Sequence, residues 1–186
     1  MCATTNYDRS LEMAFSALKL RARTGFYYDG VEYPQLLPAG LGAYQDEPAI
    51  LHLHGAVGWY RNQTGEIVEY PATAPYSPTN GLPAVLYPSN NKVVEDSIVR
   101  AIWVEFDSAL DAATHILVLG HSLADKHLVD RLRSISVPLG VTALTEADES
   151  KIKLTVPHAS ILRLRFSTNP RFKHDVRAWM TERAEA

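Results

Sequence analysis

The stretch Thr114-His-Ile-Leu-Val-Leu-Gly-His-Ser-Leu-Ala-Asp-Lys-His-Leu-Val-Asp-Arg-Leu132 decides the fold class of this chain. Its apolar run 116–119 is typical of a strand covered on both faces, as in a parallel sheet. Gly120 and Ser122 come next, and a helix follows whose apolar face carries Leu128, Val129 and Leu132. The stretch therefore predicts a strand, a tight turn and a helix. Such turns lie at the carboxyl ends of parallel strands, where open α/β sheets bind nucleotides.

Strands and helices alternate along the rest of the chain. We expect strands near 2–5, 49–53, 141–144 and 161–166, and a hairpin over 59–70. We expect three further helices. Their apolar faces are Leu11, Phe15 and Leu18; Val94, Ile98, Ile102, Phe106 and Leu110 within 93–113; and Phe172, Val176, Trp179 and Met180 after a cap at Asn169. A short helix is predicted for 147–152, and a long irregular connection for 71–89. This alternation predicts an α/β fold with a three-layer, Rossmann-like parallel sheet.

The length of 186 residues suits one domain spanning 1–186. Two loop-rich insertions, at about 21–48 and 56–92, are expected to form a lid or a small subdomain. A short hairpin around Val31–Tyr33 is expected inside the first of them.

Composition narrows the class of protein. Cys2 is the only cysteine, so neither an internal disulfide nor a cysteine-based zinc site is expected. No signal peptide or membrane-spanning apolar run is visible, so we expect a cytoplasmic protein without membrane contact. The net charge is -3, although residues after 150 are basic. Those basic residues alternate with core positions, so we do not expect nucleic acid as a partner.

Three short motifs stand in order along the chain: Thr4-Thr-Asn-Tyr-Asp8, Leu53-His-Gly55, and Leu119-Gly-His-Ser122 with Ala124-Asp-Lys-His127 behind it. Together they resemble the SIR2 family, and in particular the SIR2-like NAD-consuming domains of bacterial anti-phage systems. The resemblance covers about residues 3–130 and implies an NAD+ hydrolase that releases nicotinamide and ADP-ribose. NAD is then the substrate, and no metal is expected.

The resemblance also implies roles for individual residues. His54 would be the catalytic base, and Asn6 would hold the nicotinamide ribose and the attacking water. Asp8 and Gly55 would contact the cofactor, and Gly120, His121 and Ser122 would lie under its ribose and phosphates. An imidazole accepts a proton at neutral pH, and an amide both donates and accepts hydrogen bonds, so both groups suit this chemistry. Glu146, just past the strand predicted at 141–144, is expected to bind the adenosine ribose hydroxyls.

The chain departs from the family in two ways. The family's first unit, a Gly-Ala-Gly loop that holds the pyrophosphate, is missing, so the expected fold is incomplete at its N-terminus. The paired zinc cysteines of typical sirtuins are also missing. A nucleotide-binding or assembly module without catalysis is therefore the alternative, and a zinc-free protein deacylase is a weaker one. A homo-oligomer, or a fused or partner sensor domain, is compatible with either.

Structural roles compete with these functional ones. Asn6 and Asp8 suit helix N-caps, and Asp125 suits a cap for the helix that follows. His52 and His54 are also compatible with plain strand positions, or with a metal pair completed by His121 or His127. The segment 120–122 is equally compatible with a simple tight turn.

Overall fold

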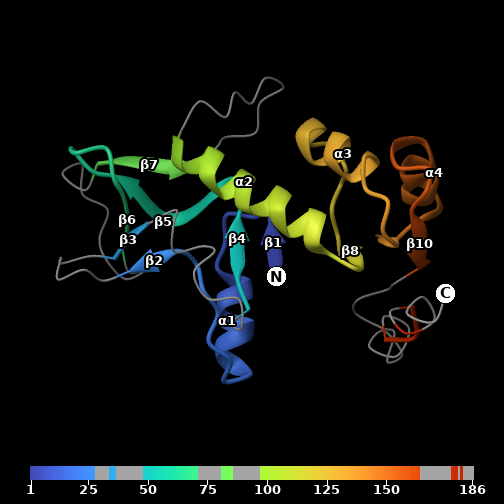
Figure 1. Ribbon diagram of the computed structural model, residues 1–186, viewed down its shortest axis with the longest axis horizontal. Helices are drawn as coiled ribbons and strands as arrows, with labels where there is room; N and C mark the ends of the chain where they lie inside the picture. The colour runs from blue at the N-terminus through green and yellow to red at the C-terminus, as the bar shows by residue number, and fades with distance from the viewer. Residues whose placement is uncertain are drawn as a thin grey trace. The chain divides into compact units, whose positions relative to one another are not determined.

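A computed structural model describes residues 1–27, 34–36, 48–70, 81–85, 97–163, 177–179 and 181. The described residues form a mixed α/β fold with parallel strand pairs, as the sequence predicts (Figure 1). The chain divides into two compact units, Met1–Ala109 and Leu110–Ala186.

In the first unit, strand β1 (Cys2–Thr4) pairs in parallel with strand β4 (Ile50–His52), and Thr4 lies opposite His52. Helix α1 (Ser10–Ala17) follows β1. Strand β4 lies at the centre of this unit's core, because all three of its residues are buried. The strands predicted at 2–5 and 49–53 are thus confirmed, with slightly shorter bounds.

An antiparallel sheet completes the first unit (Figure 1). Its order is β2 (Phe26–Tyr27), β3 (Gln35–Leu36), β6 (Ile67–Glu69), β5 (Gly55–Arg61) and β7 (Leu82–Val85). Strands β5 and β6 form the hairpin predicted over 59–70. Trp59 on β5 is buried and packs edge-on against Phe26.

Helix α2 (Ser97–Ala112) confirms part of the long helix predicted for 93–113. Ile102, Phe106 and Leu110 are buried at helical spacing, so the predicted apolar face is the buried one. Trp103 donates a hydrogen bond from its Nε1 to the carbonyl oxygen of Leu53, at 3.0 Å. This bond fixes the helix to the turn that follows β4.

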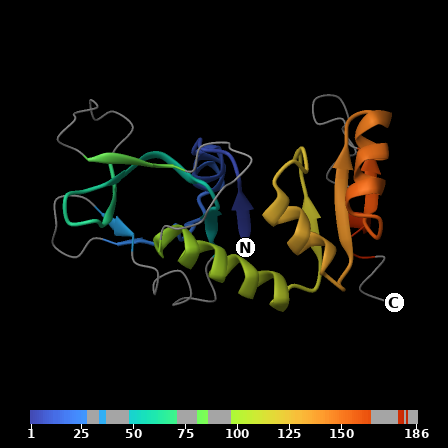
Figure 2. The same cartoon turned by 90° about the horizontal axis from the view of Figure 1, so that it is seen from above.

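The second unit is built on the parallel sheet β10-β9-β8, with β8 at Ile116–Val118, β9 at Leu139–Ala143 and β10 at Ser160–Arg163. Helix α3 (Lys126–Arg133) follows β8, and its Leu128, Val129 and Leu132 are buried as predicted. Helix α4 (Glu146–Thr155) packs against β9 (Figure 2). The quoted central stretch therefore forms the predicted strand, turn and helix.

Local side chains explain where these two helices begin. Asp125 accepts hydrogen bonds from the backbone of His127 and Leu128 at the start of α3, which confirms its predicted role as a cap. Helix α4 begins with a reciprocal capping box between Thr145 and Asp148. The box fixes the start of α4, and the helix continues to Thr155, past the short helix predicted for 147–152.

Two predictions are wrong. Leu82–Val85 is not part of an irregular connection but forms β7, where Pro83 is tolerated because the strand lies at the sheet edge. Leu18 is 70% exposed and lies at the C-cap of α1 rather than on a buried face. The predicted hairpin around Val31–Tyr33, most of the connection 71–89 and most of the last helix lie outside the described residues, although Trp179 is buried. Within the described part of the chain, none of the helices is apolar over a length that could cross a membrane.

Candidate functional site

The first unit has a candidate region at the carboxyl edge of the parallel pair β1-β4. Because parallel strands end at the same edge, residues 5–8 after β1 (the Asn6 loop) meet residues 53–57 there. Residues 53–57 comprise the turn after β4 and the start of β5, and we call them the His54 turn. The backbone N–H of Leu53 donates to the carbonyl of Thr4 at 2.9 Å. The N–H of Val57 donates to the carbonyl of Tyr7 at 2.8 Å. Two segments nearly fifty residues apart in sequence are thus joined by their backbones.

His54 is held inside this junction. Only 5% of its surface is exposed, and its ring lies 6.3 Å from that of Tyr7, centroid to centroid. The bond from Trp103 to the carbonyl of Leu53 anchors the preceding residue from α2. Burial limits the access of bulk water to the imidazole.

Asn6 is exposed, and its backbone N–H donates to Thr4 Oγ1 at 3.0 Å. Asp8 accepts a hydrogen bond from the backbone of Ser10 at 2.9 Å, and hydrogen bonds from Ser10 hold the pKa of its carboxyl below the ordinary value of 3.8. The N-cap position of α1 is Arg9, which makes no side-chain cap. Asn6 therefore does not cap the helix, and Asp8 supports the turn one residue ahead of the cap.

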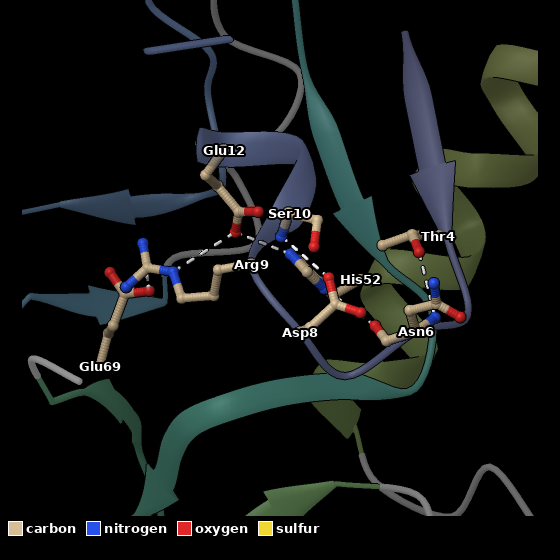
Figure 3. A network of polar contacts seen from close by, with 8 residues as sticks. All are labelled: Thr4, Asn6, Asp8, Arg9, Ser10, Glu12, His52 and Glu69. Atoms are coloured by element: carbon tan, nitrogen blue, oxygen red, sulfur yellow. Dashed lines mark hydrogen bonds and ion pairs between the residues drawn. The ribbon is translucent and has the colours of Figure 1, made fainter. Parts of the chain in front are cut away.

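The structure brings His52 and Glu12 to the same place, which the sequence did not indicate (Figure 3). His52 is 1% exposed, its Nε2 lies 2.8 Å from Glu12 Oε1, and its Nδ1 lies 3.4 Å from the Asn6 carbonyl oxygen. Trp59 stacks edge-on against the ring at 5.5 Å. Both ring nitrogens of His52 thus face hydrogen-bond acceptors. Among the described residues, no group of three or more metal-binding side chains gathers.

Arg9 links the two carboxylates of this network (Figure 3). Its Nε lies 3.6 Å from Glu12 Oε1, and its Nη2 lies 3.2 Å from Glu69 Oε1. Burial favours the neutral form of Glu12, but the hydrogen bond and charge of His52, with Arg9, outweigh it and place its pKa below 4.5. Burial dominates at Glu69 and raises its pKa above 4.5.

The second unit has a candidate region of its own, at the carboxyl edge of β8 and β9. The N–H of Gly120 donates to Thr142 Oγ1 at 3.0 Å, and Gly120 has a φ of 61°. A Cβ at Gly120 would meet nothing within 4 Å, so a ligand has room to approach the backbone. His121 Nδ1 accepts from the N–H of Leu123 at 2.9 Å, which orients the ring.

Ser122 is exposed in the same turn, and Glu146 is exposed as the first residue of α4, after β9. The turn 120–123 is thus a tight turn built around a glycine, and it leaves the residues predicted to contact the cofactor at a sheet edge. Thr142, buried on β9, was not singled out from the sequence. Its hydrogen bond with Gly120 depends on the pairing of β9 with β8, which the sequence did not reveal.

An α/β fold with polar loops at the carboxyl edges of its parallel strands is typical of nucleotide-binding domains. Within that class, the family model for the SIR2-like domain matches residues 1–141. The chain therefore belongs to the SIR2-like family, which is generally associated with NAD. All three motifs fall inside the matched range, whereas Glu146 falls outside it. None of the curated proteins compared with the chain matches it.

Proposed function

We propose that this chain is a SIR2-like NAD+ glycohydrolase that cleaves NAD+ to nicotinamide and ADP-ribose. One observation carries the proposal: the Asn6 loop and the His54 turn are hydrogen-bonded to each other at the carboxyl edge of a parallel strand pair. Family membership associates the chain with NAD, and this junction supplies an amide and an imidazole for the reaction.

The proposed reaction breaks the bond between the ribose C1′ and the nicotinamide nitrogen. The bonding electron pair leaves with nicotinamide, which departs as a neutral molecule, and the ribose becomes cation-like. Water then attacks C1′, and His54 accepts the proton that the water loses. The side chain of Asn6 orients the ribose and the water, because its amide both donates and accepts hydrogen bonds.

The remaining assignments belong to the same proposal. Asp8 and Gly55 support the nicotinamide end, while Gly120, His121 and Ser122 hold the ribose and phosphates and Glu146 binds the adenosine ribose. The open space at Gly120 supports this assignment, because a phosphate can approach the backbone there. We also propose, from the resemblance to defence-type relatives, that the reaction serves anti-phage defence in the cytoplasm.

Nicotinamide release by the purified chain tests the proposal. We expect the wild type to release nicotinamide from NAD+, and we expect His54→Ala and Asn6→Ala to lose the activity while remaining folded. His158→Ala is the matched control, since His158 is exposed, follows α4 and lies outside all three motifs. NAD+ cleavage by His54→Ala would remove His54 from its role as base.

A nucleotide-binding module without catalysis is the second candidate. Family membership supports it as well, because the SIR2-like match associates the chain with NAD and not with a particular reaction. Calorimetric titration with NAD+ separates the candidates. Saturable binding with no nicotinamide release supports the binding module, whereas turnover supports the enzyme.

A further inference from the structure

His52 is the most deeply buried of the polar side chains that the structure describes, and its two ring nitrogens bridge different elements. On one side Nε2 meets the Glu12 carboxylate on α1 at 2.8 Å. On the other side Nδ1 meets the carbonyl oxygen of Asn6 at 3.4 Å. Figure 3 shows the ring between Glu12 and the Asn6 loop. The imidazole is therefore the link from α1 to the backbone of Asn6.

The two partners of the His52 ring are both hydrogen-bond acceptors at neutral pH. A carbonyl oxygen only accepts hydrogen bonds, and an ionised carboxylate also only accepts. The pKa of Glu12 lies below its ordinary value, so Glu12 is ionised at neutral pH. The Glu12 contact at Nε2 fixes the orientation of the ring, and this orientation sets Nδ1 beside the Asn6 carbonyl.

We propose that His52 and Glu12 are positioning residues for Asn6: Glu12 orients His52, and His52 holds the Asn6 backbone so that its side chain meets the substrate beside His54. The inference rests on the proposed function, because it assigns Asn6 a place in the reaction. His52 acts through Asn6 and does not touch the reacting atoms.

The contact with His52 fixes one of the two backbone groups of Asn6. The N–H of Asn6 is bonded to Thr4 Oγ1 at 3.0 Å, and its carbonyl is bonded to His52. Thr4 and His52 are themselves opposite each other in the β1-β4 register. Both backbone groups of Asn6 are thus tied to one strand pair, so loss of the His52 contact releases the loop on one side. A misplacement of about 1 Å in a catalytic group costs about 100-fold in rate.

Two substitutions separate the two contacts of the His52 ring. The amide nitrogen of Asn in His52→Asn occupies the place of Nδ1, so this variant keeps a donor at the Asn6 carbonyl and loses the contact with Glu12. The amide nitrogen of Gln in His52→Gln occupies the place of Nε2, so this variant keeps Glu12 and loses Asn6. Gln also fills more of the buried volume than Asn, so a purely structural role of His52 predicts that His52→Gln is more stable and more active than His52→Asn.

The positioning role predicts the opposite order for activity. We expect His52→Asn to retain a kcat for nicotinamide release within about threefold of the wild type, and His52→Gln to fall by about tenfold or more. KM changes less than kcat, because Asn6 acts on the reacting ribose. Thermal unfolding of both variants is measured alongside. Ile67→Val, a buried change on β6 in the antiparallel sheet, is the control for a general loss of core packing.

Hydrogen exchange gives a readout that does not need activity. We expect exchange of the peptide covering the Asn6 loop to accelerate about tenfold or more in His52→Gln and to stay near wild type in His52→Asn. Glu12→Gln is expected to lie between them. Equal exchange and equal kcat in the two His52 variants, or rates that follow their thermal stability, would overturn the positioning role.

The two readouts separate this inference from the proposed function. Without nicotinamide release by the wild type, the proposed function fails, and loop exchange alone decides whether His52 positions Asn6. With release by the wild type and no difference between His52→Asn and His52→Gln, the positioning role fails and the proposed function stands.

Discussion

Replacing Gly55 with alanine tests how the His54 turn is built. Gly55 has a φ of 76°, and a Cβ placed on it would lie 2.1 Å from the carbonyl oxygen of Ala84 and 3.2 Å from the Cα of Val85. Both atoms belong to the backbone of β7, which pairs with Gly55. No rotation of a side chain relieves this overlap, so β7 must move away from β5.

Gly65 is the matched control for that substitution. Its φ is 88°, close to that of Gly55, but a Cβ on Gly65 meets nothing within 4 Å. Left-handed backbone costs an L-residue about 1–2 kcal/mol, and both variants carry this term. Overlap with well-packed atoms adds about 1–3 kcal/mol, and only Gly55→Ala carries it. The difference between the two variants therefore isolates the contact with β7.

Urea unfolding followed by circular dichroism measures this difference. With a slope of about 2 kcal/mol per molar urea, we expect the midpoint of Gly55→Ala to lie about 0.5–1.5 M below that of Gly65→Ala. Equal midpoints would refute the reasoning, because they would mean that the Gly55 backbone does not approach β7 closely. A large loss of stability in Gly55→Ala would also show that packing against β7 requires a glycine after His54, apart from any contact with NAD.

Further substitutions test other parts of the structure. Trp103→Phe removes the donor to the carbonyl of Leu53, so we expect the free energy of urea unfolding to fall by about 1–3 kcal/mol and nicotinamide release to decrease. Unchanged values for both would contradict the anchoring of the His54 turn. Glu69 has a raised folded pKa, so its contribution to stability is present below about pH 4.5 and is lost as the pH rises through the folded pKa. Glu69→Gln should therefore raise the melting temperature relative to the wild type more at pH 7 than at pH 4, and the reverse order would show that Arg9 dominates. Asp125→Ala should lower the stability by about 1 kcal/mol through loss of the α3 cap, and an unchanged urea midpoint would argue against that cap.

Local patterns predicted much of the fold. The apolar run after Thr114 and the helical spacing from Leu128 to Leu132 are properties of adjacent residues, and they gave β8 and α3 correctly. The strand β7 was missed because Pro83 argues against a strand, and only pairing with β5 makes an edge position available to it. Helix α4 was predicted too short because residues 153–155 follow its buried residue Ile152 and add no further buried apolar position.

The residues of the candidate site were also predicted only in part. The motifs placed Asn6 and His54 in loops, and the parallel pairing of their strands explains why those loops meet. Glu12 carried no signal, since a glutamate in the first turn of a helix is ordinary there. Its meeting with His52 depends on how α1 packs against β4, which is a tertiary contact. Residues that position others through such contacts have no local pattern by which a single sequence reveals them.

The most direct test of the account is a structure of the purified chain bound to an NAD analogue whose bond between ribose and nicotinamide resists hydrolysis. We expect the nicotinamide ribose to lie within hydrogen-bonding distance of both the Asn6 amide and the His54 imidazole. A ribose bound away from the junction of the Asn6 loop and the His54 turn would contradict the proposed chemistry.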